Sequence, residues 1–170
     1  VTETSIRNAL TALVAGAARG IVVWNGFKEN ISITNCDVYN NNCCGIELQD
    51  GTASGVTMTG NNVHDNADNG FGLTGLKGGT GANLISMNTV TNNGRFGIEI
   101  KNPNGTGSTS GTGSIVVENN TVSFAASVGM NNRDHAGIAV FRRGFLTNNS
   151  ENYPNIPTGA VVRNNTVSGY

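Results

Sequence analysis

Short blocks of alternating apolar and polar residues return along most of this chain. In the segment 56–66, VTMTGNNVHDN, apolar residues stand at the first, third and eighth places (Val56, Met58 and Val63), and Asn61 stands at the sixth. The same frame returns at 31–38, 83–90, 115–122 and 160–167. Its sixth place is occupied in turn by Cys36, Asn61, Asn88, Asn120 and Asn165. A frame that returns in this way is an internal repeat, which has to be recognised before any fold is assigned.

A second block, which opens with glycine, alternates with the first. It reads GIVVW, GIELQ, GFGLT, GIEIK and GIAVF, and it begins at Gly20, Gly45, Gly70, Gly97 and Gly137. The intervals between these glycines are 25, 25, 27 and 40 residues. Because side chains alternate along a strand, Ile21 and Val23 point inward and Val22 and Trp24 point outward. Each repeat therefore predicts three short strands, one in the glycine block and two in the asparagine frame.

Strands this short, without helical segments between them, do not build βαβ units. A coil that advances one strand spacing per turn, about 4.8 Å, instead gives every strand a parallel partner above and below. The sequence therefore predicts an all-β, single-stranded parallel β-helix of about five complete coils across residues 20–170. Residues 1–19 are expected to form an N-terminal cap, either as an amphipathic helix or as a partial coil. The partial coil is preferred, because Leu13 stands seven residues before Gly20.

The recurring asparagine is explained by the backbone at the corner where it lies. A tight corner buried beneath the next coil leaves N–H and C=O groups without ladder partners. Stacked asparagine amides donate and accept along the axis, so they satisfy one another and the corner. The sequence therefore predicts an asparagine ladder in which Cys36 takes one place.

Composition and charge narrow the function classes. Glycine, at 24 of 170 residues, is about twice as frequent as usual, and charged residues make up only 12%. With a net charge of −1, the protein lacks the broad positive potential that is expected of a nucleic-acid-binding protein. No run of 18 apolar residues is present, so no membrane span is expected. The composition, rich in Asn, Gly and Thr, favours a secreted or cell-surface protein.

The cysteines carry little functional information on their own. Cys43 and Cys44 are adjacent in the turn before Gly45. Structural free thiols are the favoured interpretation, ahead of a strained vicinal disulfide. A metal site is disfavoured, because neither a CxxC motif nor a histidine partner accompanies them.

The NNTV corner, the GI-x-[ILV] strand and the asparagine ladder resemble the right-handed parallel β-helix repeats of the pectate-lyase-like superfamily. This superfamily includes polysaccharide lyases, polygalacturonases, mannuronan C5-epimerases, NosD-like periplasmic proteins and non-catalytic surface proteins. The resemblance covers roughly residues 20–170. It implies a right-handed helix and a sugar-binding cleft on the outer face of the glycine-block strands, walled by long loops.

The repeat is interrupted by three long insertions near the C-terminal end. They are residues 101–114, 123–136 and 142–158. Long loops on a rigid scaffold are where binding sites usually lie. Outward Glu47 and Glu99 are expected on either side of a notch at Gly72, and outward Trp24 and Phe141 are aromatics of the kind that stack on sugar rings. Packing of Trp24 beneath a cap is the competing interpretation.

The basic residues near the insertions suggest an anionic ligand such as a uronate chain. They are Arg95, Lys101, Arg133, His135, Arg142 and Arg143. The chemistry of lyases and epimerases, which the resemblance implies, requires a base, a carboxylate clamp and a proton donor. The candidate catalytic residues are Lys101 or His135 as base, Arg142 or Arg143 as clamp, and Tyr153 as proton donor. The candidate substrate-binding residues are Glu47, Glu99, Arg133, Asp134, Phe141 and Arg143, with Glu99 also a candidate Ca²⁺ ligand.

The sequence therefore predicts an extracellular β-helix that binds an acidic polysaccharide, with lyase or C5-epimerase activity as the enzymatic form of this function. The competing hypothesis is a non-catalytic structural, adhesin or spike-like module. Neither nucleic acid nor a membrane is expected as a partner.

Overall fold

The computed structural model describes residues 2, 5–7, 18–78, 81–104, 113–125, 134–141 and 159–170. All secondary-structure elements within these residues are β-strands, and all of their pairings are parallel. Predicted residues Arg133, Arg142, Arg143 and Tyr153, and most of the three insertions, lie outside this part of the chain.

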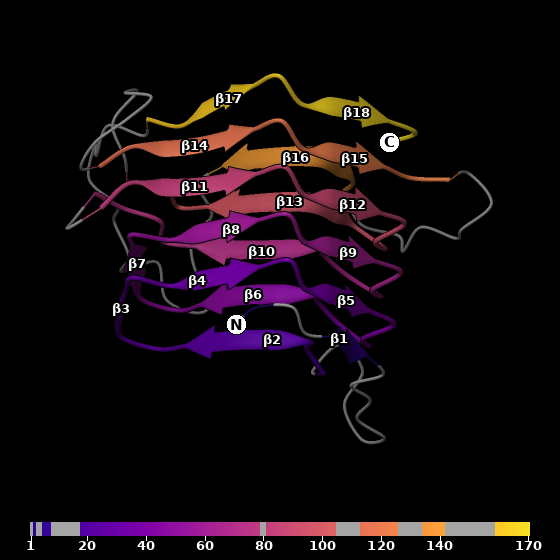
Figure 1. Cartoon of the computed structure of the whole chain (residues 1–170), viewed down its shortest axis with the longest axis horizontal. Coiled ribbons are helices and arrows are strands. Elements are labelled where there is room, and N and C mark those ends of the chain that lie inside the picture. The colour runs from indigo at the N-terminus through magenta and orange to yellow at the C-terminus, as the bar shows by residue number, and fades with distance from the viewer. Residues whose placement is uncertain are drawn as a thin grey trace.

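Three long sheets run along the molecule (Figure 1). The GI sheet, made of the glycine-block strands, contains β2 (Ile21–Trp24), β6 (Ile46–Gln49), β10 (Phe71–Thr74), β13 (Phe96–Lys101) and β16 (Ala136–Phe141). The middle sheet contains β4 (Ser32–Thr34), β8 (Thr57–Thr59), β11 (Asn83–Ser86), β14 (Ile115–Glu118) and β17 (Val161–Arg163). The closing sheet contains β1 (Ser5–Arg7), β5 (Asp37–Tyr39), β9 (Asn62–His64), β12 (Thr89–Thr91), β15 (Thr121–Ser123) and β18 (Thr166–Ser168).

The chain visits the three sheets in the same order in each turn. Each of the five GI strands is followed by one strand of the middle sheet and one of the closing sheet, which makes five coils. Figure 1 shows the coils rising from β2 (indigo) to β17 and β18 (yellow). The parallel β-helix with about five coils is therefore confirmed.

The first two coils contain a fourth short strand that the sequence reading missed. β3 (Phe27–Glu29) pairs with β7 (Thr52–Ser54), and isolated bridges continue this line from Ala53 to Leu76. The pattern was hidden because the inward residue of β3 is Lys28, which is buried. Its Nζ donates to the carbonyls of Gly26, at 3.3 Å, and Asp50, and burial lowers the pKa of Lys28.

Within the segment expected to cap the helix, the described strand is β1. It pairs with β5, and Ile6 lies beside Val38 in register. Ile6 thus stands in the column where Leu13 was expected. Leu13 itself lies outside the described residues.

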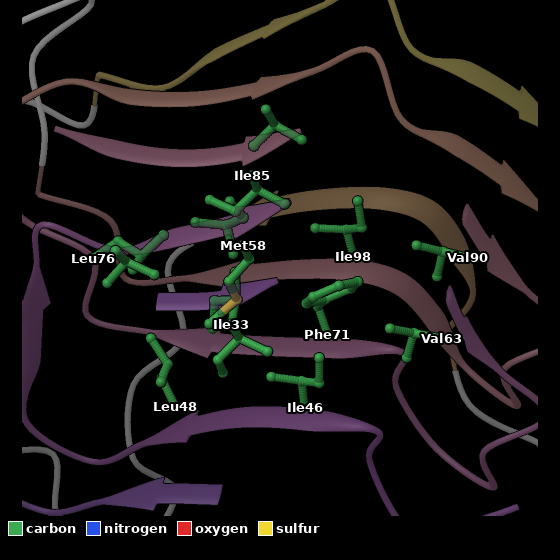
Figure 2. Close-up of a cluster of buried hydrophobic side chains, with 14 of the residues drawn as sticks. Ile33, Ile46, Leu48, Met58, Val63, Phe71, Leu76, Ile85, Val90 and Ile98 are labelled. Carbon is green, nitrogen blue, oxygen red and sulfur yellow. The ribbon is translucent and has the colours of Figure 1, made fainter. Parts of the chain in front are cut away.

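The core is a set of columns in which the same inward position is apolar in successive coils (Figure 2). Ile46, Phe71 and Ile98 form one such column in the GI sheet. The middle sheet contributes Ile33, Met58, Ile85 and Val117, and the closing sheet contributes Val38, Val63, Val90 and Val122. All of these side chains are at most 1% exposed. Because one coil alone leaves these residues uncovered, each coil is stabilised by its neighbours.

The predicted asparagine ladder is confirmed. Asn88 shows the bonding of the ladder. Its Oδ1 accepts two hydrogen bonds from Asn61, one from the backbone N–H at 3.0 Å and one from Nδ2 of the Asn61 side chain at 2.9 Å. Nδ2 of Asn88 donates to Asn120 Oδ1 at 2.9 Å and to the Met58 carbonyl at 3.0 Å. Asn165 continues the ladder above Asn120, and the Cys36 N–H donates to Asn61 Oδ1 below it. Each amide therefore satisfies both its neighbours and the corner carbonyl of the preceding coil.

A second, shorter ladder was not predicted. Asn41 Nδ2 donates to Asn66 Oδ1 at 2.8 Å, and Asn66 Nδ2 donates to Asn93 Oδ1 at 2.9 Å. All three side chains are buried, and Asn66 and Asn93 also donate to the carbonyls of Val38 and Val63. The signal was present in the sequence, since each asparagine follows the closing valine of its repeat by three residues.

In every coil, the residue that directly precedes the main-ladder residue in the sequence adopts a left-handed backbone conformation. It is an asparagine or glycine in four of them: Asn35, Gly60, Asn119 and Asn164, with φ between 53° and 66°. The exception is Met87, at φ 53° and 65% exposed. Methionine lacks the short polar side chain that makes this conformation tolerable for asparagine.

Replacing Asn88 with Leu should lower the free energy of unfolding by about 1–3 kcal/mol, because the Met58 carbonyl and the Asn61 amide lose buried partners. Urea unfolding measures this loss. Thr89→Val, at the adjacent exposed position, is the control and should change stability by less than about 0.5 kcal/mol. An Asn88→Leu protein as stable as the parent would contradict the structural role of the ladder.

Replacing Met87 with Asn should raise the free energy of unfolding by about 0.5–1 kcal/mol, because it relieves the left-handed strain without removing buried surface. The reciprocal change, Asn119→Met, should lower it by a similar amount. Thermal and urea unfolding of both variants test the pair. Changes of the same sign in the two variants would rule out this explanation.

Candidate functional site

The outer face of the GI sheet carries two columns of side chains, in the register expected from the sequence. The first column contains Val22, Glu47, Gly72, Glu99 and Ala139. The second contains Trp24, Gln49, Lys101 and Phe141, with Thr74 beside Lys101. Residues that are distant in sequence thus become neighbours at one strand spacing.

Exposure along this face is greatest at the first coil. Val22 is 41% and Trp24 is 54% exposed. In the third and fourth coils the outward residues Gly72, Thr74 and Glu99 are buried, and Glu99 is only 4% exposed. The most exposed described residues of this face therefore lie at the end opposite to the predicted site near residues 97–158, where Lys101, Ala139 and Phe141 are half-buried.

Two aromatic rings meet across the face in the fourth and fifth coils. Phe96 begins β13, and Phe141 pairs with Lys101 at the end of β13, yet their ring centroids are only 5.9 Å apart. The guanidinium carbon of Arg95 lies 4.5 Å from the Phe96 ring centroid. This ring contact links the fourth and fifth coils of the GI sheet.

The two outward glutamates are both engaged by neighbours. Glu47 forms an ion pair with Arg19, and Glu99 Oε2 accepts a hydrogen bond from Asn69 Nδ2 at 2.8 Å. Burial, the largest influence, lowers the pKa of Arg19, but the hydrogen bond and charge of Glu47 outweigh it, and the pKa is raised overall.

Gly72 separates these two glutamates, as predicted. A Cβ atom at this position would lie 3.5 Å from Glu47 Cγ and 3.7 Å from Glu99 Oε2. The notch is therefore only about as wide as a methyl group.

The other described candidates do not converge on one reacting centre. Lys101 lies beside Phe141, at the end of β16, whereas His135 directly precedes the start of β16. The six-residue strand between them spans about 20 Å at 3.3 Å per residue. Asp134 is exposed and lies next to His135. The assignments of Arg133, Arg142, Arg143 and Tyr153 stay predictions, because these residues lie outside the described part of the chain.

The first coil carries an exposed aromatic patch, defined here as Trp24 and Phe27. Trp24 Nε1 donates to Asp50 Oδ2 at 2.8 Å, and the Arg19 guanidinium carbon lies 5.7 Å from the Trp24 ring centroid. Phe27 is 52% exposed, and Lys77 Nζ lies 4.6 Å from its ring centroid. The sequence reading singled out Trp24 but missed Phe27, because β3 was not anticipated.

A second group lies in the turn that leads into the GI sheet, where the sequence analysis considered Cys43 and Cys44 but did not connect Asp68 with them. Cys43 and Cys44 are buried free thiols whose sulfur atoms are 3.4 Å apart. Their hydrogen bond lowers the pKa of Cys43 and raises the pKa of Cys44 well above its ordinary value, with burial adding to the increase at Cys44. Asp68, one coil further on, brings a carboxylate to the same place. The signal was positional, since Asp68 follows Cys43 by one repeat of 25 residues.

Comparison with protein families agrees with this architecture. A family model described as "right handed beta helix region" matches residues 14–83. Neither the curated proteins nor the solved structures contain a match to the chain. The parallel sheets and the asparagine ladder continue beyond the matched residues, and together with this match they make the chain a right-handed parallel β-helix repeat protein. Among the residues that the structure describes, no helix has the length and hydrophobicity to cross a bilayer.

Replacing Asn69 with Asp should destabilise the protein by about 1–3 kcal/mol at pH 7, because it places a second carboxylate against buried Glu99. The repulsion raises the pKa of the pair above the unfolded value, so the lost stability should return as the pH falls and one carboxyl group takes up a proton. Urea unfolding between pH 7 and pH 5 measures this recovery.

Asn62→Asp is the matched control, because Asn62 Nδ2 donates to Asp37 Oδ1 at 2.9 Å in an exposed pair. Solvent screening should keep its effect below about 1 kcal/mol. Equal losses in the two variants would contradict the role of burial at Glu99.

Proposed function

We propose that this protein is an extracellular β-helix module that binds an acidic polysaccharide along the outer face of the GI sheet, with the aromatic patch of the first coil as its anchor. The observation that carries the proposal is the pair of exposed aromatic rings, Trp24 and Phe27, each with a cationic side chain against it. Exposed aromatic surface of this size on a rigid sheet provides large contact area at low entropic cost.

The charges around the patch favour an anionic chain. Arg19 and Lys77 already lie against the two rings, so a sugar that stacks there meets a guanidinium and an ammonium group. A guanidinium group binds carboxylates well, since its planar donors match their geometry. Uronate-containing polysaccharides combine both features, a ring face that stacks and a carboxylate that pairs.

Lyase or C5-epimerase activity is the second candidate function. Its specific support is the placement of Glu47 and Glu99 on either side of Gly72, which brings two carboxylates to one notch of the face. The reaction also needs a base and a carboxylate clamp. Lys101, His135, Arg142, Arg143 and Tyr153 are proposed for these roles, and Ca²⁺ on Glu99 is the proposed metal.

Trp24→Ala should weaken binding to alginate, pectate or chondroitin about tenfold, or 1.4 kcal/mol, through loss of stacking. Affinity electrophoresis and calorimetry with each polysaccharide, with and without Ca²⁺, measure this effect. Met87→Ala is the control, because Met87 is an exposed apolar residue, at 65%, on a corner away from the GI sheet. Lys77→Gln should weaken binding to the acidic chains and leave binding to a neutral glucan unchanged.

The same samples distinguish the functions. Absorbance from new C4–C5 double bonds detects a lyase, and NMR of the uronate C5 protons detects an epimerase. Binding without turnover supports a module without catalysis. Full affinity of the Trp24→Ala protein would contradict the proposed anchor, and failure to bind any polysaccharide would favour a structural or adhesin-like role.

A further inference from the structure

The turn before the GI sheet gathers three metal-ligating side chains from two coils. The sulfur atoms of Cys43 and Cys44 and a carboxylate oxygen of Asp68 all lie within 4.8 Å of one another. Among the residues that the structure describes, these three form the group of His, Cys, Asp or Glu side chains whose ligand atoms lie that close together. We propose that Cys43, Cys44 and Asp68 bind a thiophilic divalent cation such as Zn²⁺, at a site separate from the polysaccharide face.

The solenoid backbone holds these donors in place without any ligand. The Asp68 N–H donates to the Cys43 carbonyl at 2.9 Å, and the Gly45 N–H donates to the Asn69 carbonyl at 2.9 Å. Next to the turn, the buried Asn41–Asn66 pair ties the same two coils together. Asp68 is therefore fixed one coil above Cys43, and binding of a cation costs little ordering of the chain.

The donor set and its spacing suit zinc. Zn–S bonds of about 2.3 Å in a tetrahedral site place two sulfurs about 3.8 Å apart, and the Cys43 and Cys44 sulfurs are already 3.4 Å apart. A carboxylate is a common third ligand, and three protein ligands leave one position open. Two thiolates select a soft cation over Ca²⁺ or Mg²⁺.

Charge also favours a cation once the thiols have lost their protons. Zn²⁺ binding displaces one proton from each thiol and forms two Zn–S bonds, so two protons are released for each bound ion. The two thiolates, Asp68 and nearby Glu47 would then bring four negative charges, which the single charge of Arg19 does not balance. A divalent cation would neutralise two of the three negative charges that remain.

A vicinal disulfide is the less favourable use of the same pair. Adjacent Cα atoms are about 3.8 Å apart across a trans peptide, whereas disulfides usually join Cα atoms about 4.4–6.8 Å apart. Bond formation would also require an oxidant, and it would not use the Asp68 carboxylate. The third donor is the feature that points to a metal.

The test uses the reduced whole chain carrying Cys36→Asn, which removes the remaining thiol and places asparagine at a ladder position. Equilibrium dialysis should give one Zn²⁺ per chain, with release of two protons at constant pH. Cd²⁺ should produce a thiolate-to-metal charge-transfer band in the ultraviolet. Cys43→Ser and Cys44→Ser should each weaken Zn²⁺ binding at least a hundredfold, and Asp68→Asn at least tenfold.

Asp65→Asn is the matched control, because Asp65 is an exposed carboxylate three residues earlier that pairs with His64. It should leave Zn²⁺ affinity unchanged. Circular dichroism shows whether each variant folds, and the proton count and Cd²⁺ band of the Cys36→Asn parent test the site even if a serine variant does not. Absence of Zn²⁺ binding by the reduced parent, or equal Zn²⁺ affinity in the Asp68→Asn protein, would overturn the proposal.

Discussion

The structure depends on satisfying the backbone at one corner of every coil. Between the middle and closing sheets the chain turns sharply while buried beneath the next turn, where water cannot reach its N–H and C=O groups. One residue type, asparagine, satisfies these backbone groups in successive coils. Each side-chain amide donates to a backbone carbonyl of the preceding coil, and neighbouring amides also bond one another; the residues are Asn61, Asn88, Asn120 and Asn165. Because the ladder fixes this corner, extra residues enter elsewhere, after β10, β13, β15 and β16.

Stacking in register converts sequence intervals into side-chain columns, and the chemistry of the protein is set by those columns. Most inward columns are apolar and form the core, with Lys28 and the asparagine ladders as buried polar exceptions. Outward and turn columns vary from coil to coil, so that Glu47, Gly72 and Glu99 become neighbours on one face. The stacked backbone likewise places Cys43 beside Asp68. A site in this fold is therefore assembled from residues one repeat apart, and conventional short motifs do not reveal it.

The sequence predicted those parts of the fold that repeat. The main ladder and the outward columns could be predicted from the residue intervals of the repeat, because the buried corner and the strand positions recur at the same place in each coil. β3 escaped notice because Lys28 interrupts the apolar pattern, and its ammonium group is satisfied by carbonyls that only the folded corner brings close. The exposure of Trp24 and the burial of Glu99 were also beyond the pattern. Their surroundings include contacts across coils, from Trp24 to Asp50 and from Asn69 to Glu99, which the repeat pattern does not specify.

The first two coils hold more of the distinctive chemistry than the described edges of the long insertions. Arg19 is central to this arrangement, because its guanidinium group pairs with Glu47 and lies over the Trp24 ring, and its charge also acts on Cys43. One guanidinium group therefore pairs with the glutamate beside the thiol pair and also lies over the aromatic ring. Since these contacts join residues of adjacent coils, a ligand at Trp24 and a cation at Cys43 would both interact with the charge of Arg19.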